Sequence, residues 1–262
     1  MKNQEKKNNF MEKPMIKSEL IVQAAHWLEK FRKIIVWIIL ILLAAASFVY
    51  FKADLLISIL TKPLNGIQLH FMTPSEGLMA KLQISFLGGI VIASPIIIFL
   101  VILATGPVLT KKVKRLLIFL IIPLAFVLFV GGMTFAYKLV LPSTIKFLIE
   151  CGNGFMQPIL SANEYFTFMA TLLFCVGLIF ELPLILIALS RMHIINSKML
   201  KNKRKVAILL SFISIALIAP TLDAFTFLLV TLPILALYEI SIWSILLLEK
   251  KDIRKKRKEL AQ

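Results

Sequence analysis

Long apolar runs alternate with short polar segments along most of the chain, a pattern that predicts a helical membrane protein with several spans. At 1.5 Å per residue, most of these runs are long enough for a hydrocarbon layer of about 30 Å. The fifth run covers only about 21 Å, so the last two are predicted as two short spans with a tight outer turn or as a re-entrant hairpin. The six runs are Ile34–Phe51, Ile84–Leu103, Leu116–Tyr137, Phe166–Leu189, Val206–Ala219 and Ala224–Leu248.

The segment before the first run is polar and basic. Residues 1–17 have the composition of a disordered tail. From Ser18 onward, apolar residues recur at spacings of three and four, which predicts a helix lying along the membrane surface. The predicted organisation is a basic tail with an amphipathic helix over residues 1–33, a six-span domain over 34–248 and a basic tail over 249–262.

Four prolines lie within the apolar runs, where each removes a helix hydrogen bond and favours a bend. They predict an all-α bundle with bent helices and a concave shape. The two large outer segments, 52–83 and 141–165, are predicted to hold short helices that rest on the outer membrane face. The four prolines are Pro95, Pro123, Pro183 and Pro233.

Composition and charge agree with this class and add an orientation. The chain is 59% hydrophobic with a net charge of +16, whereas a soluble domain is about half apolar. Of the 30 Lys and Arg residues, 25 fall in segments on one side of the predicted spans. The positive-inside rule then predicts that both termini are cytoplasmic, or stromal in an organelle. Because the cations sit between spans, a nucleic-acid partner is not predicted.

Glu181 is the ionisable residue of the fourth run, two positions before Pro183. A carboxylate at membrane depth costs about 2.5 kcal/mol or more, so it usually has a role inside a bundle or beside a cavity. The alternative is a protonated or hydrogen-bonded acid that is merely tolerated. A small-solute transporter using Glu181 and Glu239 as proton or cation sites is the alternative function, although no internal repeat supports it. A third possible function is that of a scaffold for other membrane helices.

Motifs for familiar enzyme chemistry are missing from the sequence. It has no GxxxxGK[ST] loop, no HExxH pair and no nucleophile elbow. Its histidines, His26, His70 and His193, fall in separate segments and are not predicted to share a metal. The chain is therefore predicted to be no enzyme and to need neither a metal nor a cofactor.

Several ordered motifs resemble those of the TatC family, the large membrane subunit of the twin-arginine protein translocase. The run Gly132 to Tyr137, followed by Pro142, is similar to the family's third span, and Tyr165 through Pro183 is similar to its fourth. The resemblance extends from about residue 20 to 249. The other matching motifs are His26-x-Leu28-Glu29, Thr73-Pro74-Ser75-Glu76, Ala93-Ser94-Pro95, Pro107-x-Leu109, Asp223 and Tyr238-Glu239-Ile240.

This resemblance implies a receptor for the twin-arginine signal peptides of folded cargo, working with TatA- and TatB-type single-span subunits and the proton-motive force in a larger complex with other copies. It implies signal binding at Glu29, Arg32, His26 and Leu28, because carboxylates match Arg forks. An i,i+3 pair between Glu29 and Arg32 is the local alternative. The resemblance also implies partner docking at Glu181 and Pro183, and outer-face structural roles for Glu76, Pro74, Pro142 and Asp223.

Two positions depart from the family pattern. Val113 stands in the loop where a second acid is expected, and Phe31 stands where an arginine is expected. The departures imply either a signal-binding face with one fewer carboxylate or a paralogue with altered cargo. Asp223 has two compatible roles, as the N-cap of the last helix and as a functional contact.

Overall fold

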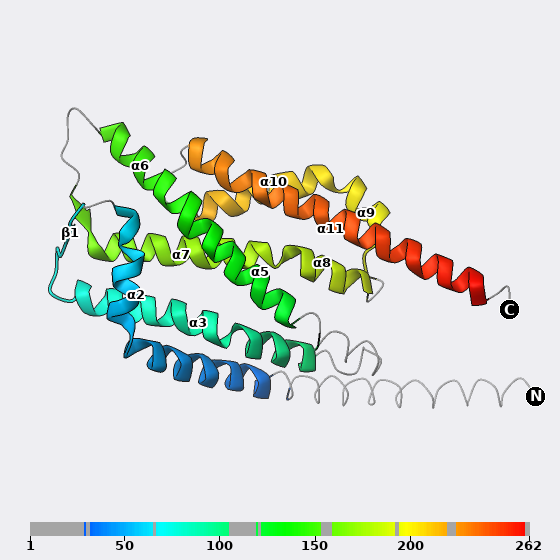
Figure 1. Ribbon diagram of the computed structural model, residues 1–262, viewed down its shortest axis with the longest axis horizontal. Coiled ribbons are helices and arrows are strands. Elements are labelled where there is room, and N and C mark those ends of the chain that lie inside the picture. The colour runs from blue at the N-terminus through cyan, green and yellow to red at the C-terminus, as the bar shows by residue number, and fades with distance from the viewer. Residues whose placement is uncertain are drawn as a thin grey trace, which may run out of the picture.

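The computed structural model describes residues 29, 32–64, 67–104, 119, 122–152, 159–191, 194–218 and 224–259. These ranges form a bundle in which the long helices follow the long dimension of the molecule, while the short helix near residue 55 runs across it (Figure 1). Five of the six predicted runs correspond to helices long and apolar enough to cross a membrane, which confirms the all-α membrane fold. The five are Arg32–Tyr50 (the first span), Glu76–Leu100, Ile122–Glu150, Ala162–Arg191 and Phe227–Lys251.

The last two predicted runs form helices of unequal length. The fifth run is α10 (Arg204–Ile218), whose 15 residues rise about 22 Å, less than the hydrocarbon thickness of about 30 Å. It packs against α11 (Ala224–Glu259), which has 36 residues. Because residues 219–223 lie outside the described part of the chain, the short fifth span stays a prediction. The expectation that both are short is wrong, because α11 continues as a helix well beyond Leu248.

Small elements close one end of the bundle, and we call them the outer cap. They are the short helix α2 (Ala53–Leu60), the 3₁₀ turn η1 (Lys62–Leu64) and two strands, β1 (Leu69–His70) and β2 (Leu160–Ser161). The strands pair in parallel, with Leu69 opposite Leu160 and His70 opposite Ser161. The first outer segment does hold a short helix, α2, but the helical spacing of Leu78, Met79 and Leu82 after Ser75, which predicted a short surface helix, belongs to the start of the long helix α3 (Glu76–Ala104), so that prediction is wrong.

The third span does not end at Tyr137. Helix α5 (Ile122–Phe135) continues through a π-helical turn, η3 (Ala136–Val140), into α6 (Leu141–Gly152). The three segments follow one another along a single line (Figure 1). The prediction of a separate short helix on the outer membrane face is therefore wrong for residues 141–152. Pro142 lies directly after the π turn and inside this continuous helix, where its missing N–H removes one backbone hydrogen bond.

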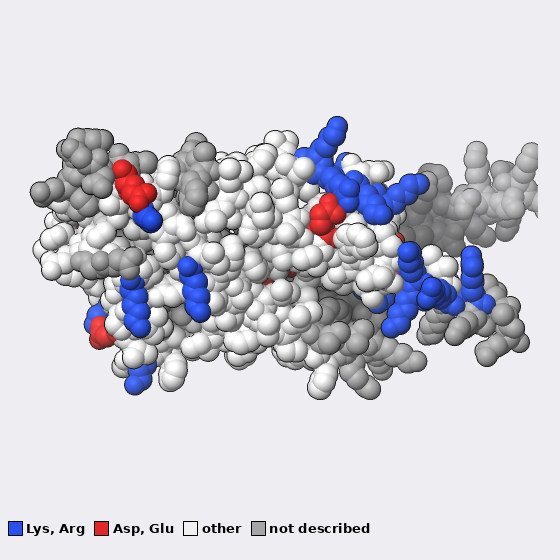
Figure 2. Space-filling view, turned by 45° about the horizontal axis from the view of Figure 1, so that its top comes forward, with Lys and Arg blue, Asp and Glu red and all other residues white. Residues whose placement is uncertain are grey.

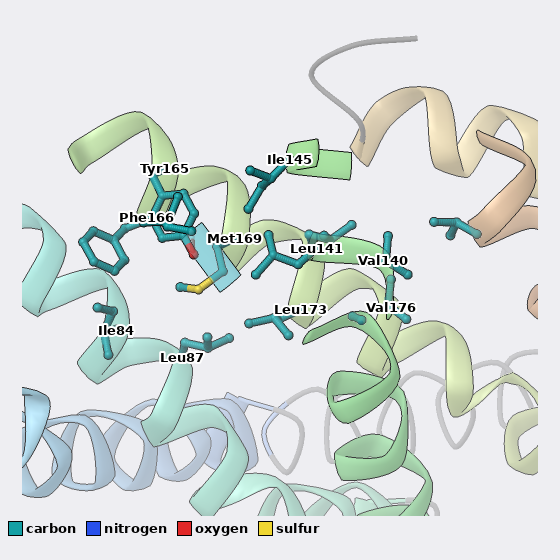
Figure 3. Packing of buried hydrophobic residues seen from close by; sticks show 14 of the residues in the cluster. Ile84, Leu87, Val140, Leu141, Ile145, Tyr165, Phe166, Met169, Leu173 and Val176 are labelled. Atoms are coloured by element: carbon teal, nitrogen blue, oxygen red, sulfur yellow. The ribbon is translucent and has the colours of Figure 1, made fainter. Parts of the chain in front are cut away.

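The centre of the bundle is α7 (Ala162–Phe180), which packs against α3, α5, α10 and α11. Its buried side chains include Phe166, Met169 and Leu173, and these point towards Ile84 and Leu87 of α3 (Figure 3). Leu141 and Val140 approach from the other side (Figure 3). Glycines allow α5 to come close: a Cβ at Gly132 would lie 2.7 Å from Cγ of Phe180, and one at Gly177 would lie 2.8 Å from Cε2 of Phe129.

The four prolines take two kinds of position. Pro95 and Pro233 lie inside the helices α3 and α11. Pro183 instead lies in the first turn of α8 (Leu182–Arg191), where proline needs no helical partner, and Pro123 is the second described residue of α5. At Pro95 the carbonyl freed four residues earlier, Val91 O, accepts a hydrogen bond from the Ser94 hydroxyl at 2.8 Å. A neighbouring side chain thus replaces the hydrogen bond that Pro95 removes.

Charged side chains gather towards the two ends of the molecule, separated by a wide band of uncharged surface (Figure 2). The first span begins at the same end at which α11 terminates, and the outer cap lies at the opposite end (Figure 1). The short helix α9 (Ser197–Asn202) also lies at the end where α11 terminates. The first described span therefore begins, and the last described helix ends, at the same end of the bundle. We call this end the inner end.

Candidate functional site

Two of the four residues expected to bind signal peptides lie in the described part of the chain. Glu29 is helical and exposed, and Arg32, also exposed, begins the first span. Within the described residues these two side chains form no ion pair with each other. Glu29 therefore presents a carboxylate to the surroundings of the inner end. The other two residues, His26 and Leu28, lie outside the described residues, as do Phe31, Val113 and Asp223.

Glu181 lies where the fourth span changes from α7 to α8. Its backbone N–H donates to Leu178 O at 3.1 Å, and its carbonyl oxygen accepts from Leu184 and Ile185. The side chain is half-buried, and its Oε1 is buried without a hydrogen-bond partner among the described residues. An unpaired buried polar atom costs about 1–3 kcal/mol, so this carboxyl group has an unused capacity to bond a partner.

An apolar groove of about 970 Å³ opens between the first span, α3 and α7. From α7 it is lined by Thr167, Ala170, Thr171 and Phe174. These residues are spaced by three and four, and the same spacing continues to Glu181, which places the carboxyl group on the helix face that lines the groove. Glu181 directly follows the last residue of α7, about two turns beyond Phe174 towards the inner end, and is not part of the groove wall.

Gln83 of α3 is a polar residue in this groove that the sequence reasoning missed. Its Nε2 donates to Thr167 Oγ1 at 2.9 Å and to Asn163 Oδ1 at 3.4 Å. Thr167 in turn donates its hydroxyl hydrogen to Asn163 O at 2.7 Å, so its oxygen can only accept from Gln83. The sequence signal was a single glutamine directly before the apolar run that starts at Ile84. This network links α3 to α7 across the groove.

Two tyrosines fix the outer cap to the spans. Tyr137 donates to Ile59 O and Tyr165 donates to Leu60 O, both at 2.6 Å. These carbonyls belong to the last turn of α2, where backbone oxygens lack helical partners. The hydroxyls therefore satisfy the end of α2 from two different spans. Sequence reasoning placed both tyrosines in family motifs without assigning them this role.

The outer-face residues have separate structural roles. Glu76 begins α3 and is buried, and Ser161 of β2 donates to its Oε2 at 3.3 Å. Pro74 lies in an exposed turn just before α3. Lys81 and Asp54 form an ion pair at 2.7 Å between α3 and α2. These contacts hold the cap in place.

Three contacts fix the inner end of α11 to its neighbours. Glu239 pairs with Arg204 of α10 at 2.8 Å, and the Tyr238 hydroxyl donates to Leu200 O of α9 at 2.9 Å. The Glu249 carboxylate accepts from the Ser197 N–H at 2.9 Å and also from the Ser197 hydroxyl. Glu239 is thus occupied by a cation of its own chain, which disfavours the transporter alternative that used it as an ion site.

Among the described residues, no group of three or more His, Cys, Asp or Glu side chains could hold a metal ion. His70 lies on β1 at the outer end, and His26 and His193 lie outside the described residues. What the geometry offers is binding: an exposed inner carboxylate, a half-buried acid at membrane depth and an apolar groove on the same helix face as that acid.

Comparison with known proteins agrees with this geometry. The family model described as Sec-independent protein translocase protein (TatC) matches residues 26–233. A relative with that name from Carboxydothermus hydrogenoformans is 33% identical over 88% of this chain and 96% of its own length. Another from Aquifex aeolicus is 35% identical over 85% of this chain and 95% of its own. An uncharacterized tatC-like protein of Gracilaria tenuistipitata var. liui is 33% identical over 81% of this chain and 88% of its own.

Solved structures give the same result. A crystal structure of the twin-arginine translocase receptor TatC in the detergent DDM matches with a TM-score of 0.73 and 32% identity, covering 84% of this chain and 99% of that one. A second crystal structure of the receptor matches with a TM-score of 0.70. Sequence, fold and family model therefore agree that this chain belongs to the TatC family and is a multi-pass membrane subunit of the twin-arginine translocase.

Proposed function

We propose that the chain is the receptor subunit that binds twin-arginine signal peptides, with Glu29 as an acceptor for the guanidinium pair. A guanidinium forms two parallel hydrogen bonds to one carboxylate, and Glu29 is exposed and free of the local pair with Arg32. His26, Leu28 and Arg32 complete the proposed binding segment. The single observation that carries the proposal is this unpaired carboxylate at the start of the first span of a TatC-family protein.

The proposed orientation places the inner end in the cytoplasm, or in the stroma of an organelle. The exposed cations of α9 and of the end of α11 lie at the inner end, and the positive-inside rule assigns such an end to the side from which proteins are exported. Both termini then lie on the side from which cargo is exported. Glu29 at this end is accessible to cargo before transport begins.

The proposed docking element for TatA- and TatB-type single-span subunits is the α7 face that carries Glu181, with Pro183 setting the helix break beside it. Supporting this are the unpaired Oε1 of Glu181 and the groove farther out on the same face. Hydrogen bonds between membrane helices average about 0.6 kcal/mol, so this contact would orient a partner helix more than hold it. In this proposal the partner and the proton-motive force, rather than the chain alone, drive transport.

A crosslinking experiment tests the signal-peptide proposal. A photoreactive group placed next to the arginine pair of a synthetic signal peptide should crosslink to the wild-type chain near residue 29. The variant Glu29→Ala should reduce this crosslinking while membrane insertion stays intact. The matched control is Glu239→Ala, which removes an inner-end carboxylate already paired with Arg204. Equal crosslinking in wild type and Glu29→Ala would remove Glu29 from the site.

Complementation addresses the position where Val113 replaces an expected acid. In a strain lacking its own TatC, the wild-type chain and the variant Val113→Glu should both be expressed and compared for export of a twin-arginine cargo. If one missing carboxylate weakens signal binding, Val113→Glu should raise export. If the chain serves altered cargo, the variant should leave export of an ordinary cargo unchanged.

Proton-coupled uptake of a small solute by the purified chain alone would instead favour the transporter function.

A further inference from the structure

One face of α11 is exposed along its whole inner half. Ile240, Trp243 and Leu247 have exposed fractions of 55%, 68% and 64%. They are spaced by three and four residues, so they form one stripe on the helix. The same spacing continues through Lys250, Arg254 and Arg257, all of which are exposed. A single helix face thus changes from apolar to cationic within one turn.

The orientation of this stripe is fixed by the packing of the rest of α11. Ile242 and Ile245 are buried against Leu200 of α9. Glu249, on the same buried side, accepts hydrogen bonds from Ser197. The apolar part of the stripe therefore points out of the bundle, where a membrane protein meets lipid tails, and the cations that follow point the same way.

Helix length places the change from apolar to cationic at the membrane boundary. The 36 residues of α11 rise about 54 Å, well beyond a hydrocarbon thickness of about 30 Å. Trp243 precedes Lys250 by about 10 Å along the axis, and tryptophan is enriched at the interface between tails and headgroups. Lys250 and Arg254 then lie at the depth of lipid phosphates.

Two acids near this stripe are already engaged, and two further acids in the sequence of α11, Asp252 and Glu259, are outnumbered by the seven Lys and Arg residues between positions 250 and 258. Glu239 pairs with Arg204, and Glu249 bonds to Ser197. Lys198 and Lys201 on α9 are exposed and add positive charge at the same end of the bundle. Figure 2 shows Lys and Arg side chains gathered at the end of the molecule where α11 terminates. The cationic part of the stripe therefore has a net attraction for anions.

We propose that this face of α11 is a binding site for an anionic phospholipid, with the phosphate held by Lys250 and Arg254 and an acyl chain lying along Trp243 and Leu247. An Arg fork matches a phosphate bidentately, and Lys adds a point charge. A nucleic acid or an acidic protein would use the cations but leave the continuous apolar half of the stripe without a role. A phospholipid contacts both halves: its acyl chain lies against the apolar half inside the membrane, and its phosphate lies against the cationic half at the membrane surface. The inference does not depend on the signal-peptide proposal.

The test is lipid retention by the full chain. Protein purified in mild detergent is equilibrated with equal amounts of phosphatidylglycerol and phosphatidylcholine that carry the same acyl chains, and bound lipids are counted by native mass spectrometry. Each basic residue near an anionic surface contributes about fivefold to affinity, so the wild type should retain phosphatidylglycerol preferentially. The double variant Lys250→Gln/Arg254→Gln should lose about 25-fold in affinity and with it the preference. Added salt should weaken the preference in the wild type.

Two controls make the outcome decisive. Lys52→Gln/Lys62→Gln removes two cations at the outer end and should keep the preference. Lys250→Arg/Arg254→Lys keeps the charge and should keep the preference too, which separates lost binding from lost folding. An unchanged preference in the double glutamine variant, or an equal loss in the outer-end variant, would overturn the proposal. A second competition uses inorganic phosphate and sodium chloride at the same ionic strength: if phosphate displaces phosphatidylglycerol and sodium chloride does not, the site binds free phosphate and the assignment to a lipid is wrong.

Discussion

Gly89 of α3 lies directly against Ala46 of the first span: a Cβ at position 89 would come within 2.7 Å of the Ala46 backbone nitrogen. Backbone atoms cannot move aside as a flexible side chain can. Only 6% of the first span is buried, against 33% of each of the other four, so this close approach is one of few contacts that hold that helix to the bundle. Small residues play this role widely in membrane helix packing.

The first prediction follows from that contact. Gly89→Leu should push the first span away from α3, at a cost of about 1–3 kcal/mol for overpacking. Since Glu29 lies only three residues before Arg32, where the first span begins, signal-peptide crosslinking near residue 29 should also fall. Thermal unfolding and the crosslinking assay measure the two effects. The matched control is Gly131→Leu, because a Cβ at Gly131 would meet nothing within 4 Å. Equal stability of the two variants would contradict the role of this contact.

The second prediction concerns the hydrogen bond from Tyr165 to Leu60 O. Tyr165→Phe keeps the ring and removes the donor, leaving the end of α2 with an unsatisfied carbonyl. We expect a loss of about 1–3 kcal/mol in the free energy of unfolding. Denaturation in detergent, followed by circular dichroism, gives the number. Tyr50→Phe, which changes an exposed tyrosine of the first span, should have no measurable effect.

The third prediction concerns the anchoring of α9 on α11. Glu249→Ala removes the acceptor for two hydrogen bonds from Ser197, and bonds to charged groups contribute about 1.5–3 kcal/mol. The segment around residues 194–203 should then become accessible to protease. Limited proteolysis with mass spectrometry would locate the cut. Glu150→Ala is the control, since Glu150 is exposed and has only a 3.8 Å pair with Lys146. A cleavage pattern identical to that of the wild type would show that other contacts hold α9.

Much of the fold could be predicted because hydrophobic length is a direct consequence of membrane thickness. The runs near Ile84 and Phe166 are confirmed as spans, but their helices begin earlier, at Glu76 and Ala162. The polar first turns are helical because the outer cap supplies partners such as Ser161 for Glu76. Hydropathy cannot report such contacts, since they join residues far apart in the sequence.

Some residues of the candidate site could be identified from the local sequence, whereas the roles of others depend on contacts that exist only in the folded protein. Glu181 was recognisable because an acid within an apolar run is rare and costly. The break between α7 and α8 was signalled by Pro183, although the sequence did not show that the helix would resume at Leu182. Gln83 was missed because its importance comes from Thr167 and Asn163 on another helix. The π turn before Pro142 has no period in the sequence that would reveal it.

The last prediction tests whether Glu181 binds a partner or is only tolerated. Glu181→Ala should weaken co-purification of a TatA- or TatB-type subunit by about threefold, the effect of a membrane hydrogen bond of about 0.6 kcal/mol. Glu181→Gln keeps acceptor and donor atoms and should restore most of the association. The control on the same helix is Glu164→Ala, an exposed acid in the outer turn of α7. If Glu181→Ala co-purifies as well as the wild type and also unfolds at a higher temperature, the buried Oε1 was a cost without a compensating contact, and the docking role must lie elsewhere on the groove face.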